Sequence, residues 1–85
     1  MRIDASPLEK KFCALKKKDP VLFNAVQKKI AQIASLEKAE IQHFKNLKYG
    51  LRTCKRAHIG SFVLMFRIEG DVLVFDRFEH HDNAY

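Results

Sequence analysis

Apolar side chains in the N-terminal part of the chain recur at the spacing of α-helices. A first stripe occupies positions i, i+4 and i+7: Leu8, Phe12 and Leu15. A second stripe follows at the spacing of another helix: Leu22, Val26, Ile30 and Ile33. Two amphipathic helices joined by a short connection predict an αα-hairpin, whose second helix ends near Ser35.

Both predicted helices have start signals in the sequence. Ser6-Pro7-Leu8-Glu9 places a hydroxyl at the N-cap, proline at the first helical position and glutamate at the third, which is a capping box. We therefore expect the first helix to begin at Pro7. Asp19-Pro20 repeats the arrangement, with the Asp19 carboxylate as the cap of the second helix.

The second half of the chain changes to the alternation of β-strands. Three such runs are Leu51–Ile59, Phe62–Ile68 and Val72–Phe78. The connections Gly60-Ser61 and Gly70-Asp71 have the length and the glycine that tight antiparallel hairpins require. The sequence predicts a three-stranded meander with a free edge, where Met1–Ala5 can add a fourth strand.

Alternation also assigns the faces of the first of these strands. One side carries a basic stripe that ends in a histidine: Arg52, Cys54, Arg56 and His58. The other side is apolar apart from Lys55: Leu51, Thr53, Ala57 and Ile59. We expect the helical hairpin to cover one face of the sheet, with Cys13 filling the core.

Length and composition limit the fold and the partners. The 85 residues suffice for one α+β domain over 1–85, and 16 Lys and Arg against 10 Asp and Glu leave a net charge of +6. This charge favours an anionic partner such as nucleic acid, an acidic protein or a membrane surface, although solubility alone can account for it.

The chain reads as cytoplasmic and without a membrane segment, because no apolar run reaches about 18 residues and the start lacks a signal peptide. Cys13 and Cys54 lack the spacing of a zinc or redox site. His80-His81-Asp82 offers metal-ligand types, but adjacent strand residues project to opposite faces, so we expect no metal and no cofactor.

Two segments of the second half resemble a known family. Lys55–Ile68 (KRAHIGSFVLMFRI) is similar to a strand–turn–strand pattern R-x-H/R-V-G-x-aromatic, and Phe75–Tyr85 (FDRFEHHDNAY) to a closing strand with a terminal H-x-x-x-Y. These patterns resemble the RelE/ParE superfamily of type II toxin–antitoxin toxins, above all its YafQ-like and archaeal RelE-like members. The resemblance covers nearly the whole chain. It implies the order β-α-α-β-β-β, with a helical hairpin on one face of an antiparallel sheet.

The resemblance implies a toxin that inhibits translation by cleaving mRNA in the ribosomal A site without a metal. It also implies a cognate RelB-like antitoxin in a hetero-oligomeric complex. Carried over by position, the active group is Lys45, His58, Arg77, His81 and Tyr85. Cleavage needs a base for the 2′-hydroxyl, an acid for the 5′-oxygen and cations for the phosphate. The two imidazoles supply the acid and the base in an order that stays open, and Tyr85 stacks on a nucleotide or orients the phosphate.

Further positions are candidates for RNA binding. The aromatic Phe62 follows the turn, and the basic candidates near the sheet are Lys48, Arg52 and Arg56. The run Lys16-Lys17-Lys18 is either a solvated helix end that complements the helix dipole or a contact to ribosomal RNA phosphates.

Two departures from the family pattern keep alternatives open. Val63 stands where many relatives have an arginine, and Lys45 where YafQ-like members have a histidine. One alternative is a ParE-like toxin that targets gyrase, and another is a non-catalytic member that only binds an antitoxin or RNA. The histidines His58 and His81 favour the nuclease, since a gyrase trap needs no acid–base pair.

Overall fold

The computed structural model describes residues 2–36, 38–41, 46–49 and 52–84, which form an α+β fold. Strand β1 (Arg2–Asp4) leads through a 3-10 turn, η1 (Ser6–Leu8), into the helices α1 (Glu9–Lys18) and α2 (Pro20–Ala34). The short helix α3 (Lys38–Ile41) precedes four strands and a last helix: β2 (Asn46–Tyr49), β3 (Arg52–Ile59), β4 (Phe62–Glu69), β5 (Val72–His80) and α4 (His81–Ala84).

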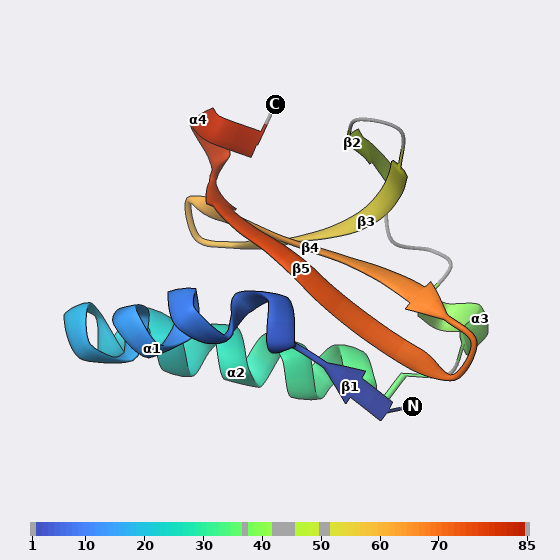
Figure 1. The fold of residues 1–85 in the computed structure, drawn as a ribbon, viewed down its shortest axis with the longest axis horizontal. Coiled ribbons are helices and arrows are strands. Elements are labelled where there is room, and N and C mark those ends of the chain that lie inside the picture. The colour runs from blue at the N-terminus through green and yellow to red at the C-terminus, as the bar shows by residue number, and fades with distance from the viewer. Residues whose placement is uncertain (1, 37, 42–45, 50–51, 85) are drawn as a thin grey trace.

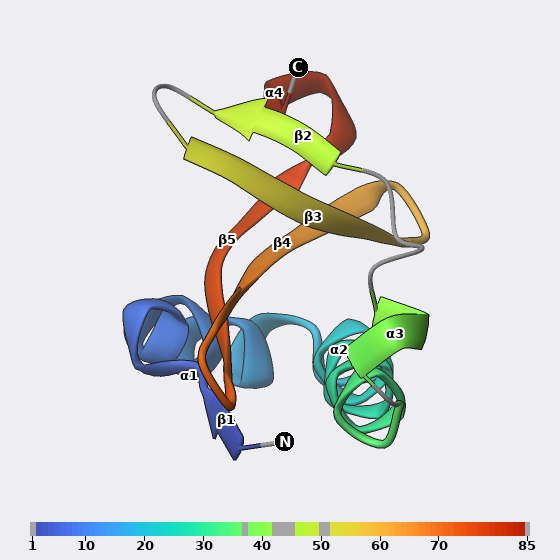
Figure 2. The same ribbon diagram turned by 90° about the vertical axis from the view of Figure 1, so that its right-hand side faces the viewer.

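The strands form one twisted sheet in the order β1-β5-β4-β3-β2. Neighbours from β2 to β5 are antiparallel, whereas β1 runs parallel to β5 on the outer edge. Helices α1 and α2 lie side by side under one face of the sheet, and α4 lies at the far end of β5 from β1 (Figures 1 and 2). The predicted helical hairpin and meander are confirmed, and β2 is an additional strand.

The main core lies between the sheet and the helices. Strands β3 to β5 contribute alternate residues to it, including Ala57, Leu64 and Phe75, and the helices contribute Phe12, Val26 and Ile33 among others. A smaller cluster on the opposite face consists of Cys54, Val63 and Met65. We call this opposite side the open face.

The hairpin turns follow the sequence prediction. Gly60 has φ 58° and Gly70 has φ 60°, a left-handed conformation that a residue with a Cβ atom adopts only with strain. The turn at Gly60 pairs Ile59 with Phe62, and the turn at Gly70 pairs Glu69 with Val72.

The start of the first helix differs from the prediction. Ser6 does not cap it with its hydroxyl, and the α-helical part begins at Glu9 after η1. The Ser6 hydroxyl instead donates to Asp4 Oδ1 at 2.6 Å, and the same oxygen accepts from Ser6 N at 3.0 Å in a local turn before η1. The prediction for Asp19 is confirmed, since its Oδ1 atom accepts from Leu22 N at 3.1 Å.

Cys13 is exposed, so its assignment to the core was wrong. It follows the buried Phe12 directly, and a step of one residue turns a helix by about 100°. Cys54 is buried in the small cluster of the open face. Lys55 lies on the helix-facing side of β3, as alternation predicts, and is 9% exposed.

Strand β5 contains a bulge. Met65 pairs with Arg77, but the next residue of β4, Phe66, pairs with Phe75. Asp76 is therefore an extra residue in β5. Its carboxylate is in an ion pair with the guanidinium of Arg67, on the open face.

Candidate active site

The structure brings two histidines together at one end of the sheet. His58 lies in β3 near the Gly60 turn, and His81 begins α4, directly after β5. Their ring centroids are 6.1 Å apart, with 39° between the ring planes. The backbone N–H of His81 donates to the carbonyl oxygen of Ser61 at 2.8 Å, which ties the end of β5 to the turn after His58.

Two arginines lie in the neighbouring row of the open face. Met65 pairs with Arg56 on one side and with Arg77 on the other. Side chains of directly paired residues project to the same face of a sheet, and Met65 belongs to the open-face cluster. His58 is paired with Val63 of the same cluster, so the arginines and His58 share this face.

One carboxylate moderates this basic group. Glu79 pairs with Val63, and its Oε1 atom lies 3.8 Å from Arg77 Nη2 and 3.3 Å from Lys11 Nζ. Lys11 also donates to the carbonyl oxygen of Phe78 at 2.7 Å and so covers part of the edge of β5. The exposed imidazoles of His58 and His81 thus adjoin a row of half-buried guanidinium groups.

Comparison with known proteins identifies the family. No protein-family model matches the chain, and no solved structure matches it. A curated relative from Methanocaldococcus jannaschii, with the name "Putative toxin RelE4", is 37% identical over 81 residues, which cover 92% of this chain and 82% of the relative. The chain belongs to the RelE family of toxins.

The remaining predicted residues of this RelE-family chain are spread over other parts of the fold. Phe62 lies on the helix-facing side, where its ring stacks on Phe78 with centroids 5.1 Å apart. Lys48 of β2 pairs with Thr53, and Arg52 pairs with Tyr49, so both pairs lie at the start of β3, whereas His58 lies near its end. Lys45 and Tyr85 lie outside the described residues.

The three lysines predicted to bind RNA form the exposed C-terminal end of α1. Lys16 Nζ lies 5.9 Å from the ring centroid of Phe23, a cation–π distance that fixes one of them against α2. These lysines belong to the helix layer and not to the open face.

The neighbouring residues His80, His81 and Asp82 are of metal-ligand types, because imidazole and carboxylate bind zinc. His80 Nδ1 and His81 Nδ1 each lie 3.6 Å from a carboxylate oxygen of Asp82, and Asp82 N donates to His80 Nδ1 at 3.2 Å. Among the described residues, no group of three or more His, Cys, Asp or Glu side chains is arranged to hold a metal ion. Nor does any helix in these segments have the length and apolarity to cross a membrane.

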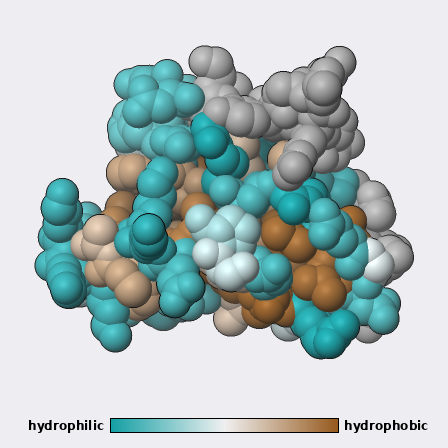
Figure 3. All heavy atoms as spheres, in the orientation of Figure 1, coloured by the Kyte–Doolittle hydropathy of each residue, from teal (hydrophilic) through white to brown (hydrophobic). Residues whose placement is uncertain are grey.

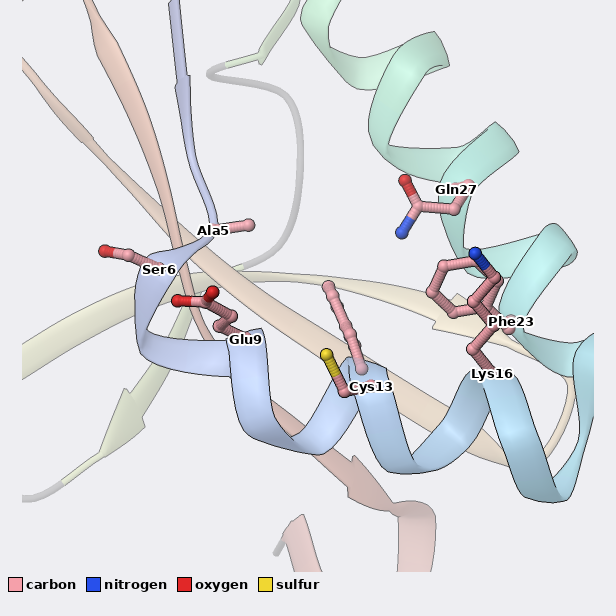
Figure 4. Close-up of a pocket in the computed structure, with 8 residues that line it drawn as sticks. Ala5, Ser6, Glu9, Cys13, Lys16, Phe23 and Gln27 are labelled. Carbon is pink, nitrogen blue, oxygen red and sulfur yellow. The ribbon is translucent and has the colours of Figure 1, made fainter.

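Two hollows were not predicted from the sequence, because they form between elements distant in the chain. The larger, of about 440 Å³, lies between α1 and α2 and is lined by Cys13 of α1 and by Phe23 and Gln27 of α2 (Figure 4). The smaller, of about 330 Å³, lies between α1 and the end of β5.

Proposed function

We propose that this RelE-family protein is a metal-independent endoribonuclease that cleaves mRNA in the ribosomal A site and thereby stops translation. The observation that carries the proposal is the contact between the imidazoles of His58 and His81 on the open face, 6.1 Å apart and beside Arg56 and Arg77. An acid–base pair next to fixed cations is what transfer of a phosphodiester to its own 2′-hydroxyl requires.

The reaction assigns one role to each group. One imidazole removes the proton of the 2′-hydroxyl, and the 2′-oxygen attacks the adjacent phosphorus. The bond from phosphorus to the 5′-oxygen breaks, and the second imidazole protonates that leaving oxygen. The products are a 2′,3′-cyclic phosphate and a 5′-hydroxyl. Arg56 and Arg77 stabilise the negative charge that builds on the phosphate oxygens. Lys45 and Tyr85 complete the proposed group from outside the described residues.

Replacement of one imidazole tests the proposal. We expect His81→Ala to lower the cleavage rate by about 10²- to 10⁴-fold, the usual contribution of a general acid or base. Wild type and variant are expressed in cells, and the ends of mRNA are mapped. His43→Ala, a histidine outside the proposed group, is the matched control and should cut like wild type.

The same experiment separates the competing functions. Cuts at defined positions that disappear in His81→Ala support the nuclease. Growth arrest with intact mRNA contradicts it and points to gyrase. Absence of both arrest and cuts in wild type contradicts any toxin activity and leaves a binding protein.

An antitoxin partner is part of the proposal. A toxin of this kind must be restrained in its host, and the net charge of +6 favours an acidic, amphipathic segment that wraps the basic surface. Such a protein, coexpressed with this chain, should abolish the growth arrest and copurify as a hetero-oligomer.

A further inference from the structure

The smaller hollow lies on the helix side of the sheet, next to the proposed catalytic His81. Helix α1, strands β4 and β5 and helix α4 line it with Lys11, Lys18, Phe62, Phe78, His80 and Asn83. In the space-filling view, hydrophobic surface is visible between the hydrophilic end of the sheet with α4 and hydrophilic α1 below it (Figure 3). The hollow is thus apolar inside and polar at its rim.

His80, which lines the hollow, and His81, which contacts His58, are adjacent in the chain. His80 pairs with Phe62 and faces the helix side, with its ring edge toward the Phe62 ring at a centroid distance of 5.3 Å. His81, the next residue, turns to His58. An RNA strand that passes α4 can therefore place one nucleotide near His80 and the adjacent phosphate near His81.

The chemistry of the lining is specific. Nδ1 of His80 accepts the N–H of Asp82, so in its neutral form the ring carries its proton on Nε2, which is then a donor. Lys18 is exposed at the rim. Lys11 donates to Phe78 O and forms an ion pair with Glu79, which also lines the hollow, so the carboxylate offsets the charge of Lys11. Asn83, which can donate and accept, completes the rim. A nucleotide joins a flat base with acceptor atoms to a phosphate, and this lining offers aromatic rings, the N–H donor of His80 and the exposed cation of Lys18.

We propose that this hollow binds an unpaired nucleotide of the RNA substrate, next to the scissile phosphate. The base contacts Phe62 and His80, and its phosphate lies near Lys18. This inference rests on the proposed function and extends it, because it assigns a substrate-binding role to the helix side of the sheet, where Phe62 lies.

Binding of an RNA that cannot be cut tests the subsite apart from catalysis. The probe is a trinucleotide with 2′-O-methyl riboses, which lack the attacking hydroxyl, titrated into the ¹⁵N-labelled protein. We expect saturable shifts at Lys18, His80 and Asn83. We also expect about tenfold weaker binding for Lys18→Ala and for His80→Ala. His80→Gln, which retains a donor at a similar place, should recover most of the loss.

Lys10→Ala is the matched control, because it removes the same charge from an exposed position of α1 that does not line the hollow. Equal affinity for the Lys18, His80 and Lys10 variants would overturn the subsite, as would shifts confined to the open face. If the hollow binds the probe but His81→Ala still cleaves, the nuclease site is wrong and the nucleotide site stands.

Discussion

Asp19 ends one helix and begins the next. Its backbone N–H donates to Leu15 O at 2.8 Å at the end of α1, and its carboxylate accepts the N–H of Leu22 in the first turn of α2. The side chain therefore satisfies one of the amides that every helix start leaves without an intrahelical partner. This residue fixes the connection of the two helices that cover the sheet.

Loss of this cap should be measurable. Asp19→Ala is expected to lower the free energy of unfolding by about 1 kcal/mol, since alanine leaves the Leu22 amide without the carboxylate. Urea unfolding followed by circular dichroism measures the change. Asp19→Asn keeps an acceptor oxygen and should retain most of the stability, whereas equal losses in both variants would contradict a capping role.

Asp4 gives the fold an acid-sensitive contact. Hydrogen bonds from the hydroxyl of Ser6 and then from its backbone N–H lower the pKa of the Asp4 carboxyl below its ordinary value. A depressed pKa stabilises the folded state above the unfolded pKa, and this contribution disappears as the pH falls through the folded pKa. Urea midpoints between about pH 6 and pH 2 should therefore fall less for Asp4→Asn than for wild type. Parallel curves would show that Asp4 contributes nothing.

Individual residues were predictable where one local rule applied. The cap Asp19 and the two turn glycines followed from the sequence in this way. The prediction was wrong for Cys13 and for the Ser6 cap, because the neighbouring elements decide those contacts. An apolar residue beside a helical stripe can face a hollow between helices, and the hydroxyl of a predicted cap can donate to a carboxylate two residues earlier instead.

At the scale of elements, the bulge in β5 allows residues on both sides of it to face the core. Leu73 and Phe75 face the helices, and so does Phe78, although alternation from Phe75 would direct Arg77 there instead. The extra residue Asp76 lets Arg77 share the open face with Met65 while Phe78 returns to the core.

Removal of the extra residue should leave a regular strand. In a deletion of Asp76, Phe75 and Phe78 keep their orientation, and Arg77 remains opposite Met65. We expect a folded protein with unchanged pairing, measured by interstrand NOEs between Met65 and Arg77. Deletion of Val74 is the matched control, since it would turn Phe75 outward and Asp76 inward, and it should unfold. If the Asp76 deletion unfolds as well, the bulge itself is required for the sheet.

The two long helices and the three long strands followed from periodicity, whereas the shorter elements, among them α3, α4 and β2, did not. Strand β2, at the edge of the sheet, has only four residues, which is too few to show a period of alternation. Its formation depends on pairing with β3. The parallel pairing of β1 with β5 is equally non-local. The site depended on the same kind of information: the resemblance grouped His58, Arg77 and His81, but the register of β3, β4 and β5 was needed to place Arg56 in the same row as Arg77.

For the whole molecule, the positive charge should govern RNA binding. The net charge of +6 predicts an affinity for RNA that falls as salt rises, because each neutralised phosphate releases counterions. We expect Arg56→Gln and Arg77→Gln each to reduce the slope of log affinity against log salt by about 0.7, the value for one contact to a single strand. Fluorescence anisotropy with an uncleavable oligonucleotide measures the slopes. The variant Lys10→Ala serves as the comparison, and an unchanged slope in both arginine variants would remove these residues from the phosphate site.

The pairing of β1 with β5 has a consequence for synthesis. Arg2 leaves the ribosome early, but its partner Val72 is added late, and the histidine pair needs residue 81 as well. Ribosomes extend chains by about 5–20 residues per second, so a nascent chain lacks both its sheet edge and its histidine pair for several seconds. A protein with the proposed nuclease activity would therefore stay harmless to the ribosome that is making it.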